Sequence, residues 1–338
     1  MQRNSTLKHI VFQQIEKISF HAIMNKMDVI VTADIGGTQI RVAVYPVNGI
    51  KPLRQKRIPT KGKDPAQVRL TGLIAELMHP DETIQAIAAA APGPTDPKLG
   101  LVLNAPNIPG WTNLPLAQIL HDQFHVPVYL GNDANVASLG EWRFGAGKGH
   151  HDLIYLTIST GIGGGVISDD RLLLGQRGLA TELGHVTVDP NGPFCGCGHR
   201  GHIEAFSSGT AIARYVAGQL AQGRASTLTA IPQPSAHDVS VAADAGDELA
   251  IEALERAGKY MGIAIANYLH IFNPSIVVLG GGVSRSGGHF FIPMRQSLKE
   301  SVFSPGYLEN LTLTTAELGD DMGLLGALAL AHTYLKIS

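Results

Sequence analysis

The stretch Asp34-Ile35-Gly36-Gly37-Thr38 separates two apolar runs, Val29 to Val31 before it and Ile40 to Val44 after it. Short apolar runs of this kind are typical of β-strands, and glycine permits a sharp turn between them because it lacks a Cβ atom. The stretch therefore predicts a hairpin closed by glycines. The same design returns at Leu153 to Ile167, through the turn Thr160-Gly161-Ile162-Gly163-Gly164-Gly165. Two copies of one hairpin predict two similar lobes, and two lobes usually enclose a cleft.

Segments with helical periodicity follow most of the predicted strands. Their apolar residues recur every three or four positions, which is the spacing of one helix face. Strands that alternate with helices are typical of an α/β sheet protein. The polar stretch Gln222 to His237 is predicted to be a surface excursion, and its residues indicate no chemistry. The predicted helices are Pro65 to Met78, Leu116 to Phe124, Asn135 to Phe144, Ile203 to Leu220, Asp247 to Phe272 and Met322 to Leu335.

Length and composition limit the number of domains and the class of protein. A chain of 338 residues favours two domains, and 44% hydrophobic with 16% charged residues excludes a disordered protein. The 26 basic and 28 acidic side chains nearly balance, so we expect neither nucleic acid nor an anionic membrane as a partner. The longest apolar stretch, Met261 to Phe272, is shorter than the roughly 20 residues that span a bilayer. Polar residues interrupt Met1 to Met27 where a signal peptide needs an unbroken apolar run, so we expect no export signal and a cytoplasmic protein.

Both glycine turns are suited to binding phosphate. Backbone N–H groups can approach phosphate oxygens where the Cβ atoms are absent, a threonine hydroxyl adds a donor, and Asp34 can hold Mg²⁺ through water. One such turn is equally well explained as an ordinary hairpin, but two opposed turns can hold one polyphosphate from both sides. Neither turn matches the GxxxxGK(S/T) loop, which excludes a P-loop protein. The candidate residues are Asp34, Gly36, Gly37, Thr38, Thr160, Gly161 and Gly163.

A third glycine cluster, Gly280 to Gly282, follows the apolar strand Ile276 to Leu279. Ligands of α/β proteins bind outside the ends of such strands. We therefore expect Gly281 and Gly282 to receive the adenosine of ATP.

The candidate catalytic residue is Asp133, in the stretch Gly131-Asn132-Asp133-Ala134-Asn135, where a strand ends and a helix begins. An aspartate at a helix start is often only a cap. The glycine turns, however, indicate phosphoryl transfer, which needs positioning, charge neutralisation and a carboxylate that accepts the proton of the attacking hydroxyl. We therefore predict that Asp133 is the general base and that the amide of Asn132 contacts a sugar hydroxyl.

Thiols, imidazoles and carboxylates are concentrated between Glu182 and Glu204. Cys195 and Cys197 are the only cysteines, and a disulfide between residues so close in sequence would be strained. Zn²⁺ prefers tetrahedral sulfur and nitrogen ligands, so we predict a structural zinc site. The alternatives are two unpaired thiols beside surface histidines, or a site in which His199 takes part. The predicted ligands are His185, Cys195, Cys197 and His202.

A metal in this segment would order the acidic residues that reach the sugar. Glu182 and Glu204 can accept hydrogen bonds from sugar hydroxyls, and His185 can donate from one ring nitrogen while the other binds zinc. Two loops, Ala91 to Pro94 and Asn104 to Trp111, are equally well explained as plain connections. The predicted sugar contacts within these loops are Gly93 and Asn107.

Six motifs together resemble the ROK family of repressors, open reading frames and kinases. Their order and spacing match the family over roughly Asp28 to Lys336, although the family pattern has cysteine at the position of His202. The motifs are Asp34-Ile-Gly-Gly-Thr-Gln-Ile-Arg-Val, Ala91-Pro-Gly-Pro, Gly131-Asn-Asp-Ala-Asn, Thr160-Gly-Ile-Gly-Gly-Gly, Glu182-Leu-Gly-His and Cys195 to Glu204.

The resemblance implies the two-lobed, actin-like fold of hexokinases, a ribonuclease H-like fold with a duplicated domain and a central cleft for ATP, Mg²⁺ and sugar. It implies an N-terminal extension at 1–27, a small lobe at 28–134 with 322–338, and a large lobe at 135–321 that includes a zinc loop at 185–202. A homo-oligomer, dimer or tetramer, is the family's habit. The implied base is Asp133, and the implied sugar contacts are Asn107, Asn132, Glu182, His185 and Glu204.

Glucose is the expected substrate, because Glu182, His185 and Glu204 resemble the arrangement of the zinc-containing bacterial glucokinases. N-acetylmannosamine, N-acetylglucosamine, fructose and allose stay open as alternatives. A ROK repressor needs a winged-helix domain before the first strand, and Met1 to Met27 has room for one helix only, at Leu7 to Ile18. The intact base argues against a non-catalytic, sugar-responsive regulator, and the cysteine block argues against an acetate or glycerol kinase.

Overall fold

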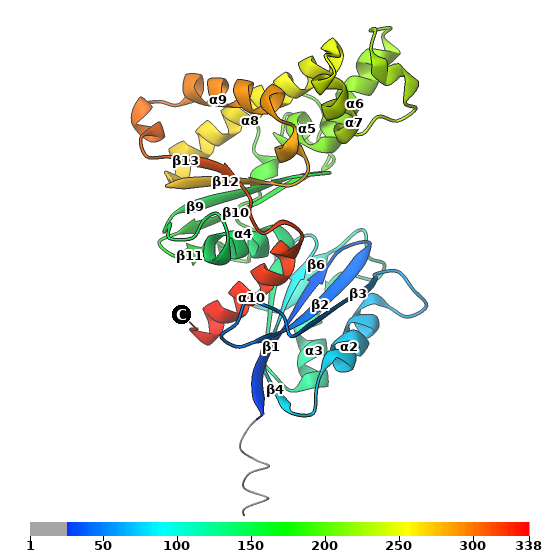
Figure 1. Ribbon diagram of the computed structural model, residues 1–338, viewed down its shortest axis with the longest axis vertical. Coiled ribbons are helices and arrows are strands. Elements are labelled where there is room, and N and C mark those ends of the chain that lie inside the picture. The colour runs from blue at the N-terminus through cyan, green and yellow to red at the C-terminus, as the bar shows by residue number, and fades with distance from the viewer. Residues whose placement is uncertain (1–25, 338) are drawn as a thin grey trace, which may run out of the picture.

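The computed structural model describes residues 26–337, and two five-stranded sheets form its framework (Figure 1). The strand order in the first sheet is β3-β2-β1-β4-β8. Strands β1 to β3 are antiparallel, whereas β4 and β8 extend the sheet in parallel with β1. These strands are β1 (Met27–Ile35), β2 (Gln39–Pro46), β3 (Arg54–Pro59), β4 (Glu82–Ala91) and β8 (Val128–Asn132).

The second sheet repeats this topology strand for strand. Its order is β11-β10-β9-β12-β13, with β9 to β11 antiparallel and with β12 and β13 parallel to β9. The repeat confirms the duplicated α/β architecture that the two glycine hairpins predict. These strands are β9 (Leu153–Ile158), β10 (Ile162–Ser168), β11 (Arg171–Leu172), β12 (Ile276–Gly280) and β13 (Thr312–Thr315).

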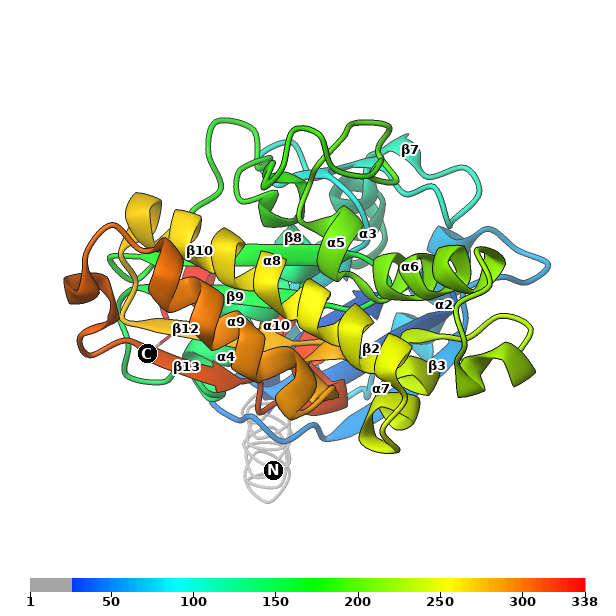
Figure 2. The same ribbon diagram turned by 90° about the horizontal axis from the view of Figure 1, so that it is seen from above.

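Helices cover the outer face of each sheet. The apolar faces of α2 (Ala66–Leu77) and α3 (Leu116–Phe124) are buried against the first sheet. Helices α8 (Glu248–Phe272) and α9 (Gly288–Ser301) lie side by side over the second sheet (Figure 2). The smaller elements are β5 (Thr95–Asp96), β6 (Leu101–Asn104), β7 (Thr112–Leu114), α5 (Glu204–Ser207), α6 (Gly209–Ala221) and α7 (Ala236–Asp244).

Two helices, α4 (Asp133–Phe144) and α10 (Met322–Leu335), lie between the sheets. The chain passes from the first sheet to the second through α4, and it returns from β13 through α10, which packs against β1 and β4. The two helices approach closely, because a Cβ atom on Gly326 would lie 2.2 Å from the carbonyl oxygen of Val136, and one on Gly140 would lie 3.0 Å from the Gly326 backbone. This contact fixes how the lobes meet.

One predicted helix is wrong. The segment Ile203 to Leu220 is split into α5 and α6 at Ser208, whose extended backbone and hydroxyl cap the second helix through the N–H of Ala211. No helix is predicted where α9 lies. Helix α7 begins within the stretch Gln222 to His237, which is predicted to be a surface excursion. The other predicted helices agree with the structure to within two residues.

Two sequence predictions concern the chain ends and the membrane. The extension at 1–27 and its helix at Leu7 to Ile18 lie almost wholly outside the described residues. None of the helices described between residues 26 and 337 combines the length and apolar character needed to cross a bilayer.

The glycine contact between α4 and α10 can be tested with a matched pair of Gly→Ala substitutions. Gly326→Ala should lower the free energy of unfolding by about 1–3 kcal/mol, because the new methyl group has no room beside Val136. Gly72→Ala, in α2 where a Cβ meets no atom within 4 Å, should raise it by about 0.5–1 kcal/mol. Urea denaturation checks both values, and equal effects at the two positions would contradict the close contact.

Candidate functional site

A cavity of about 460 Å³ lies between the two sheets, at the start of α4. Asp34 and Arg41 line it from the first sheet, Thr157 from the second, and Asp320 from the segment before α10. Asp133, the first residue of α4, also faces this cavity. Segments that are far apart in the sequence therefore converge on the candidate base.

Asn132, rather than Asp133, caps helix α4. Its side-chain oxygen accepts hydrogen bonds from the backbone N–H groups of Ala134 at 3.0 Å and Asn135 at 3.3 Å. Its amide nitrogen donates to the carbonyl oxygen of Gly93 at 2.9 Å. The neighbour thus fulfils the cap role that is the ordinary explanation for an aspartate here, and the carboxylate of Asp133 is left facing the cleft.

Burial raises the pKa of Asp133 from 3.8 to about 6. The negative charges of Asp34 and Glu182 add to this rise, whereas hydrogen bonds from Ala134 N–H and Asn132 oppose it. Asp133 is exposed at the mouth of the cleft, and the dense protein atoms around its carboxylate are what remove it from bulk water. A carboxyl group with this pKa is ionised at neutral pH and is still basic enough to accept a proton.

The first glycine turn is held from outside by Thr60. The Thr60 hydroxyl donates to the Gly36 carbonyl oxygen at 2.6 Å. The backbone N–H of Thr60 donates to the carbonyl oxygen of Thr38 at 2.8 Å. A Cβ on Gly37 would lie 2.9 Å from the Cβ of Asn107. The predicted phosphate turn and the predicted sugar loop are therefore in contact, and the Thr60 contribution was missed because nothing in the sequence joins it to the turn.

The second glycine turn is joined to Glu204. One carboxylate oxygen of Glu204 accepts the backbone N–H of Ile162 at 2.9 Å, and a Cβ on Gly161 would lie 2.6 Å from the same oxygen. Gly163 faces the start of α4, since a Cβ there would lie 2.9 Å from that of Ala134. A predicted sugar contact thus touches a predicted phosphate turn.

A larger cavity of about 790 Å³ opens beside this turn. Of the residues predicted to contact ATP, Thr160 and Gly282 line it, whereas Gly36, Gly37 and Thr38 of the first turn do not. Gly281 has a positive φ of 84°, and a Cβ there would lie 2.3 Å from the Ile158 carbonyl oxygen, so only glycine fits. No chemistry is predicted for the stretch Gln222 to His237, yet the end of this stretch lines the cavity. Further lining residues that the sequence did not predict include Gly209, Thr210, Ser235, His237 and Arg285.

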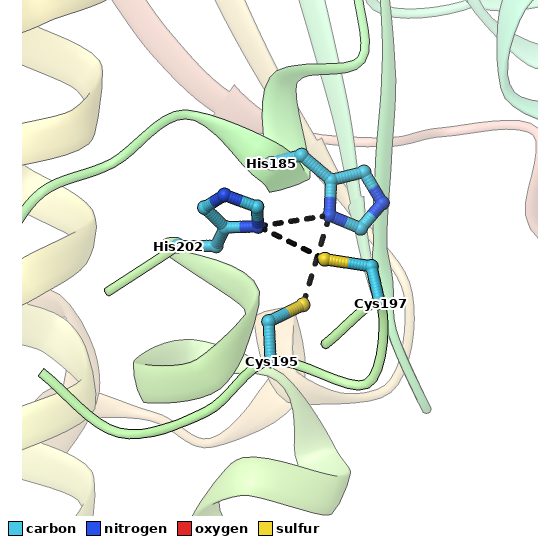
Figure 3. Close-up of side chains that lie close together, drawn as sticks. All are labelled: His185, Cys195, Cys197 and His202. Carbon is cyan, nitrogen blue, oxygen red and sulfur yellow. Dashed lines mark hydrogen bonds between the residues drawn. The ribbon is translucent and has the colours of Figure 1, made fainter. Parts of the chain in front are cut away.

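The predicted zinc ligands lie together (Figure 3). One ligand atom from each of the four side chains falls within 4.8 Å of all the others. Tetrahedral zinc with bonds of about 2.0–2.3 Å sets ligand atoms roughly 3.3–3.8 Å apart. The Nδ1 atoms of His185 and His202 are 3.3 Å apart, Cys195 Sγ is 3.6 Å from Nδ1 of His185, and Cys197 Sγ is 3.3 Å from Nδ1 of His202. The donor set and its spacing therefore fit a zinc ion.

His202 completes this cluster, and His199 is not a member of it. Burial, followed by the nearby rings of His185 and His199, lowers the pKa of His202, which favours the neutral imidazole that binds metals. Both cluster histidines direct Nδ1 inward, which leaves Nε2 of His185 on the opposite side of its ring (Figure 3). Cys195 Sγ lies 3.1 Å from a carboxylate oxygen of Glu204, so the cluster adjoins the sugar-contact residue.

Thr181, directly before Glu182, adopts a strained conformation that the sequence does not indicate. Its φ is 67°, in the left-handed region that β-branched residues avoid. The Thr181 hydroxyl donates to the side-chain oxygen of Asn135 in α4 at 3.0 Å. The strained residue thus connects the segment that carries Glu182 and His185 to the helix that begins with Asp133.

Arg41 is a further residue of the site that the sequence analysis did not single out. Its Nε donates to Oδ2 of Asp34 at 3.0 Å, and its guanidinium also donates to the backbone carbonyl of Asp320. Arg41 lies directly opposite Asp34 in the β1–β2 ladder. The tight hairpin at Gly36 and Gly37 sets this register, so counting outward from the turn would have found the pair.

The fold and the cavity define a class: a two-lobed α/β protein with the actin-like fold and a carboxylate in a cavity lined from both sheets. The model of the ROK family matches residues 30–334, and the chain belongs to this family. The predicted resemblance is therefore confirmed.

Relatives cover nearly the whole chain. A glucokinase from Thermotoga maritima is 37% identical over 304 residues, which are 88% of this chain and 95% of the relative. An N-acetylmannosamine kinase from Citrobacter koseri is 35% identical over 303 residues, 88% and 97% of the two chains. The crystal structure of a ROK family glucokinase from Streptomyces griseus in complex with glucose and AMPPNP has a TM-score of 0.73 and 33% identity, covering 90% of this chain and 99% of that one. These names agree with the predicted class, sugar kinases.

The strain at Thr181 can be separated from its hydrogen bond by two substitutions. Thr181→Ala removes the hydroxyl but keeps the left-handed backbone, so the free energy of unfolding should fall by about 1 kcal/mol. Thr181→Gly loses the same bond but relieves the strain, so it should be about 1 kcal/mol more stable than Thr181→Ala. Urea denaturation measures the difference, and an alanine variant as stable as the glycine variant would show that no strain is stored here.

Proposed function

We propose that the chain is an ATP-dependent glucokinase, which transfers the γ-phosphoryl group of ATP to glucose and releases ADP and glucose 6-phosphate. The observation that carries this proposal is Asp133, a carboxylate with a pKa of about 6 in a cavity that Asp34 and Thr157 line from strands leading toward the two glycine turns. Family membership and the relatives named glucokinase support the choice of reaction.

Asp133 is the proposed general base. It accepts the proton of the attacking sugar hydroxyl as the new oxygen–phosphorus bond forms and the bond from the γ-phosphorus to the bridging oxygen breaks. Phosphoryl transfer depends mainly on positioning and charge neutralisation, so the remaining groups of the cleft hold the two substrates in line. Burial keeps the pKa of Asp133 raised, and the neighbouring carboxylates of Asp34 and Glu182 add to this rise.

The nucleotide is proposed to lie across the two cavities. In the two turns, the backbone N–H groups of Gly37, Thr38, Thr160 and Gly161 are the proposed phosphate donors, because those of Gly36 and Ile162 already donate to the Gln39 carbonyl oxygen and to Glu204; Asp34 holds Mg²⁺ through water. Because Arg41 engages only Oδ2 of Asp34, the other carboxylate oxygen is left for that water. The adenosine would then occupy the cavity lined by Thr160 and Gly282.

The sugar is proposed to lie on the other side of Asp133. Its contacts are Asn107 against the first turn, Glu182 beside the base, Nε2 of His185, and Glu204, whose carboxylate oxygens each keep a further lone pair for a hydroxyl. An N-acetylated hexosamine is the second candidate, because a relative of nearly equal identity is named N-acetylmannosamine kinase.

We also propose that the cluster of His185, Cys195, Cys197 and His202 holds a structural zinc ion. Four protein ligands close the coordination shell, and two thiolates balance the charge of the ion. The ion would fix His185 with Nε2 toward the sugar and would hold the segment that ends at Glu204. No step of the reaction passes through it.

Replacement of the proposed base should separate catalysis from folding. Asp133→Asn should lower kcat by about 10² to 10⁴, and wild-type kcat/KM should fall as pH drops below about 6, where the carboxylate becomes protonated. The pKa of Asp133 is higher in the folded protein than in the unfolded chain, so stability falls as pH rises from about 4 to 6. At neutral pH the ionised carboxylate still lowers stability by this full amount. The variant should therefore melt at the same or a higher temperature.

A coupled ADP-release assay over a panel of hexoses and N-acetylhexosamines measures kcat and KM, and thermal denaturation measures the melting temperature. The substitution of an exposed residue, Asp64→Asn, is the control. Glucose should give the highest kcat/KM. Turnover on no sugar would end the kinase proposal, and preference for an N-acetylhexosamine would replace glucose with the second candidate.

The zinc proposal predicts about one zinc ion per chain in elemental analysis of the purified protein. His202→Ala should lose its zinc to a chelator at least tenfold more readily, roughly the effect of removing a supporting group at a metal site, and the chelated protein should melt at a lower temperature. His199→Ala is the matched control and should keep its zinc. Zinc-free protein, or equal loss from both variants, would contradict the assignment.

A further inference from the structure

Glu141 in α4 is a buried carboxylate that the proposed reaction does not use. Its side chain is fully buried, and it accepts hydrogen bonds from the backbone N–H groups of Ala146 at 3.0 Å, Glu317 at 3.1 Å and Leu318 at 2.9 Å. Among residues 26–337, no lysine or arginine forms an ion pair with it. A buried carboxylate that is neutralised only by backbone dipoles is costly, so a structure that keeps one has a use for its position.

The partners of Glu141 belong to the return connection between the sheets. Residues 316–321 lead from β13 of the second sheet to α10, which packs on the first. Glu141 itself lies on α4, the outward connection, so its carboxylate ties the two connections together. Gly145 makes room for this, because a Cβ there would lie 2.2 Å from a carboxylate oxygen of Glu141.

The tied segment reaches the catalytic cavity. Gly319 and Asp320, directly after the two bound N–H groups, line the cavity that contains Asp133. The backbone carbonyl of Asp320 accepts a hydrogen bond from the guanidinium of Arg41, which in turn donates to Oδ2 of Asp34 at 3.0 Å. A continuous series of hydrogen bonds and two backbone residues therefore runs from Glu141 to Asp34.

We propose that Glu141 is a positioning residue for the Mg·ATP site: its carboxylate fixes the segment 317–320, which orients Arg41 and through it the carboxylate of Asp34. The inference rests on the proposed function, because it takes Asp34 as the group that holds hydrated Mg²⁺. A carboxylate that turns away from the metal by even a small angle loses the water-mediated contact, as outer groups at metal sites generally show. A merely structural role would change stability and leave the two substrates affected alike.

The test compares Glu141→Gln with Glu317→Gln. Glutamine at 141 presents an NH₂ group to backbone N–H donors, so the Kd for Mg·ATP by titration calorimetry and the KM for Mg·ATP should rise about tenfold, with the KM for glucose nearly unchanged. Glu317→Gln is the matched control, because its side chain is exposed and only its backbone N–H takes part. Gly145→Ala displaces the carboxylate without changing its charge, and it should act in the same direction if the glutamine variant fails to fold.

A double-mutant cycle with Arg41→Lys supplies the decisive result. If Glu141 acts through Arg41, the double variant should bind Mg·ATP no more weakly than the weaker single variant. Independent, multiplying effects, or equal changes in both KM values, would overturn the inference. If the wild type binds Mg·ATP but phosphorylates no sugar, the proposed function fails, and the Kd values alone decide the role of Glu141.

Discussion

The close packing of α4 against α10 is the contact on which the rest of the molecule depends. Both helices lie between the sheets, and each carries a glycine at the crossing, Gly140 and Gly326, so that their backbones nearly touch. Because α4 begins with Asp133, this packing sets the candidate base at the junction of the lobes, where strands of both sheets can reach it. A larger residue at the crossing would move the base relative to one sheet or the other.

From this junction, a few polar side chains connect parts of the site that would otherwise be independent. Glu204 touches both the second glycine turn and the cysteine cluster, Asn132 holds the Gly93 loop while it caps α4, and Asn107 packs on the first turn. The sides proposed for the nucleotide and the sugar therefore share residues rather than merely adjoining each other. Ordering of the cysteine segment by a metal would consequently reach as far as the N–H of Ile162.

The sequence predicts this molecule well where the signal is local. Strand alternation and glycine turns give both hairpins, and the density of soft ligands gives the cluster with His202 in it. The sequence fails where a distant partner decides. The break at Ser208 depends on a capping hydroxyl, and tertiary packing places Ser235 and His237 in the wall of the cavity proposed for the nucleotide. Glu141 binds amides 176 residues away in the chain, which no local pattern reveals.

Several groups near the cleft are individually unfavourable. The carboxylate of Asp133 has its pKa raised by burial, Thr181 is held at φ of 67°, and Glu141 is buried without a cation. Each is retained because large apolar cores on both sheets supply the stability that these groups reduce. All three lie on α4 or form a hydrogen bond to it. The helix between the lobes is therefore the element that holds these unfavourable groups in place. A change in the angle between the lobes would thus act together on the proposed base, the segment proposed to hold the sugar and the side proposed to hold Mg·ATP.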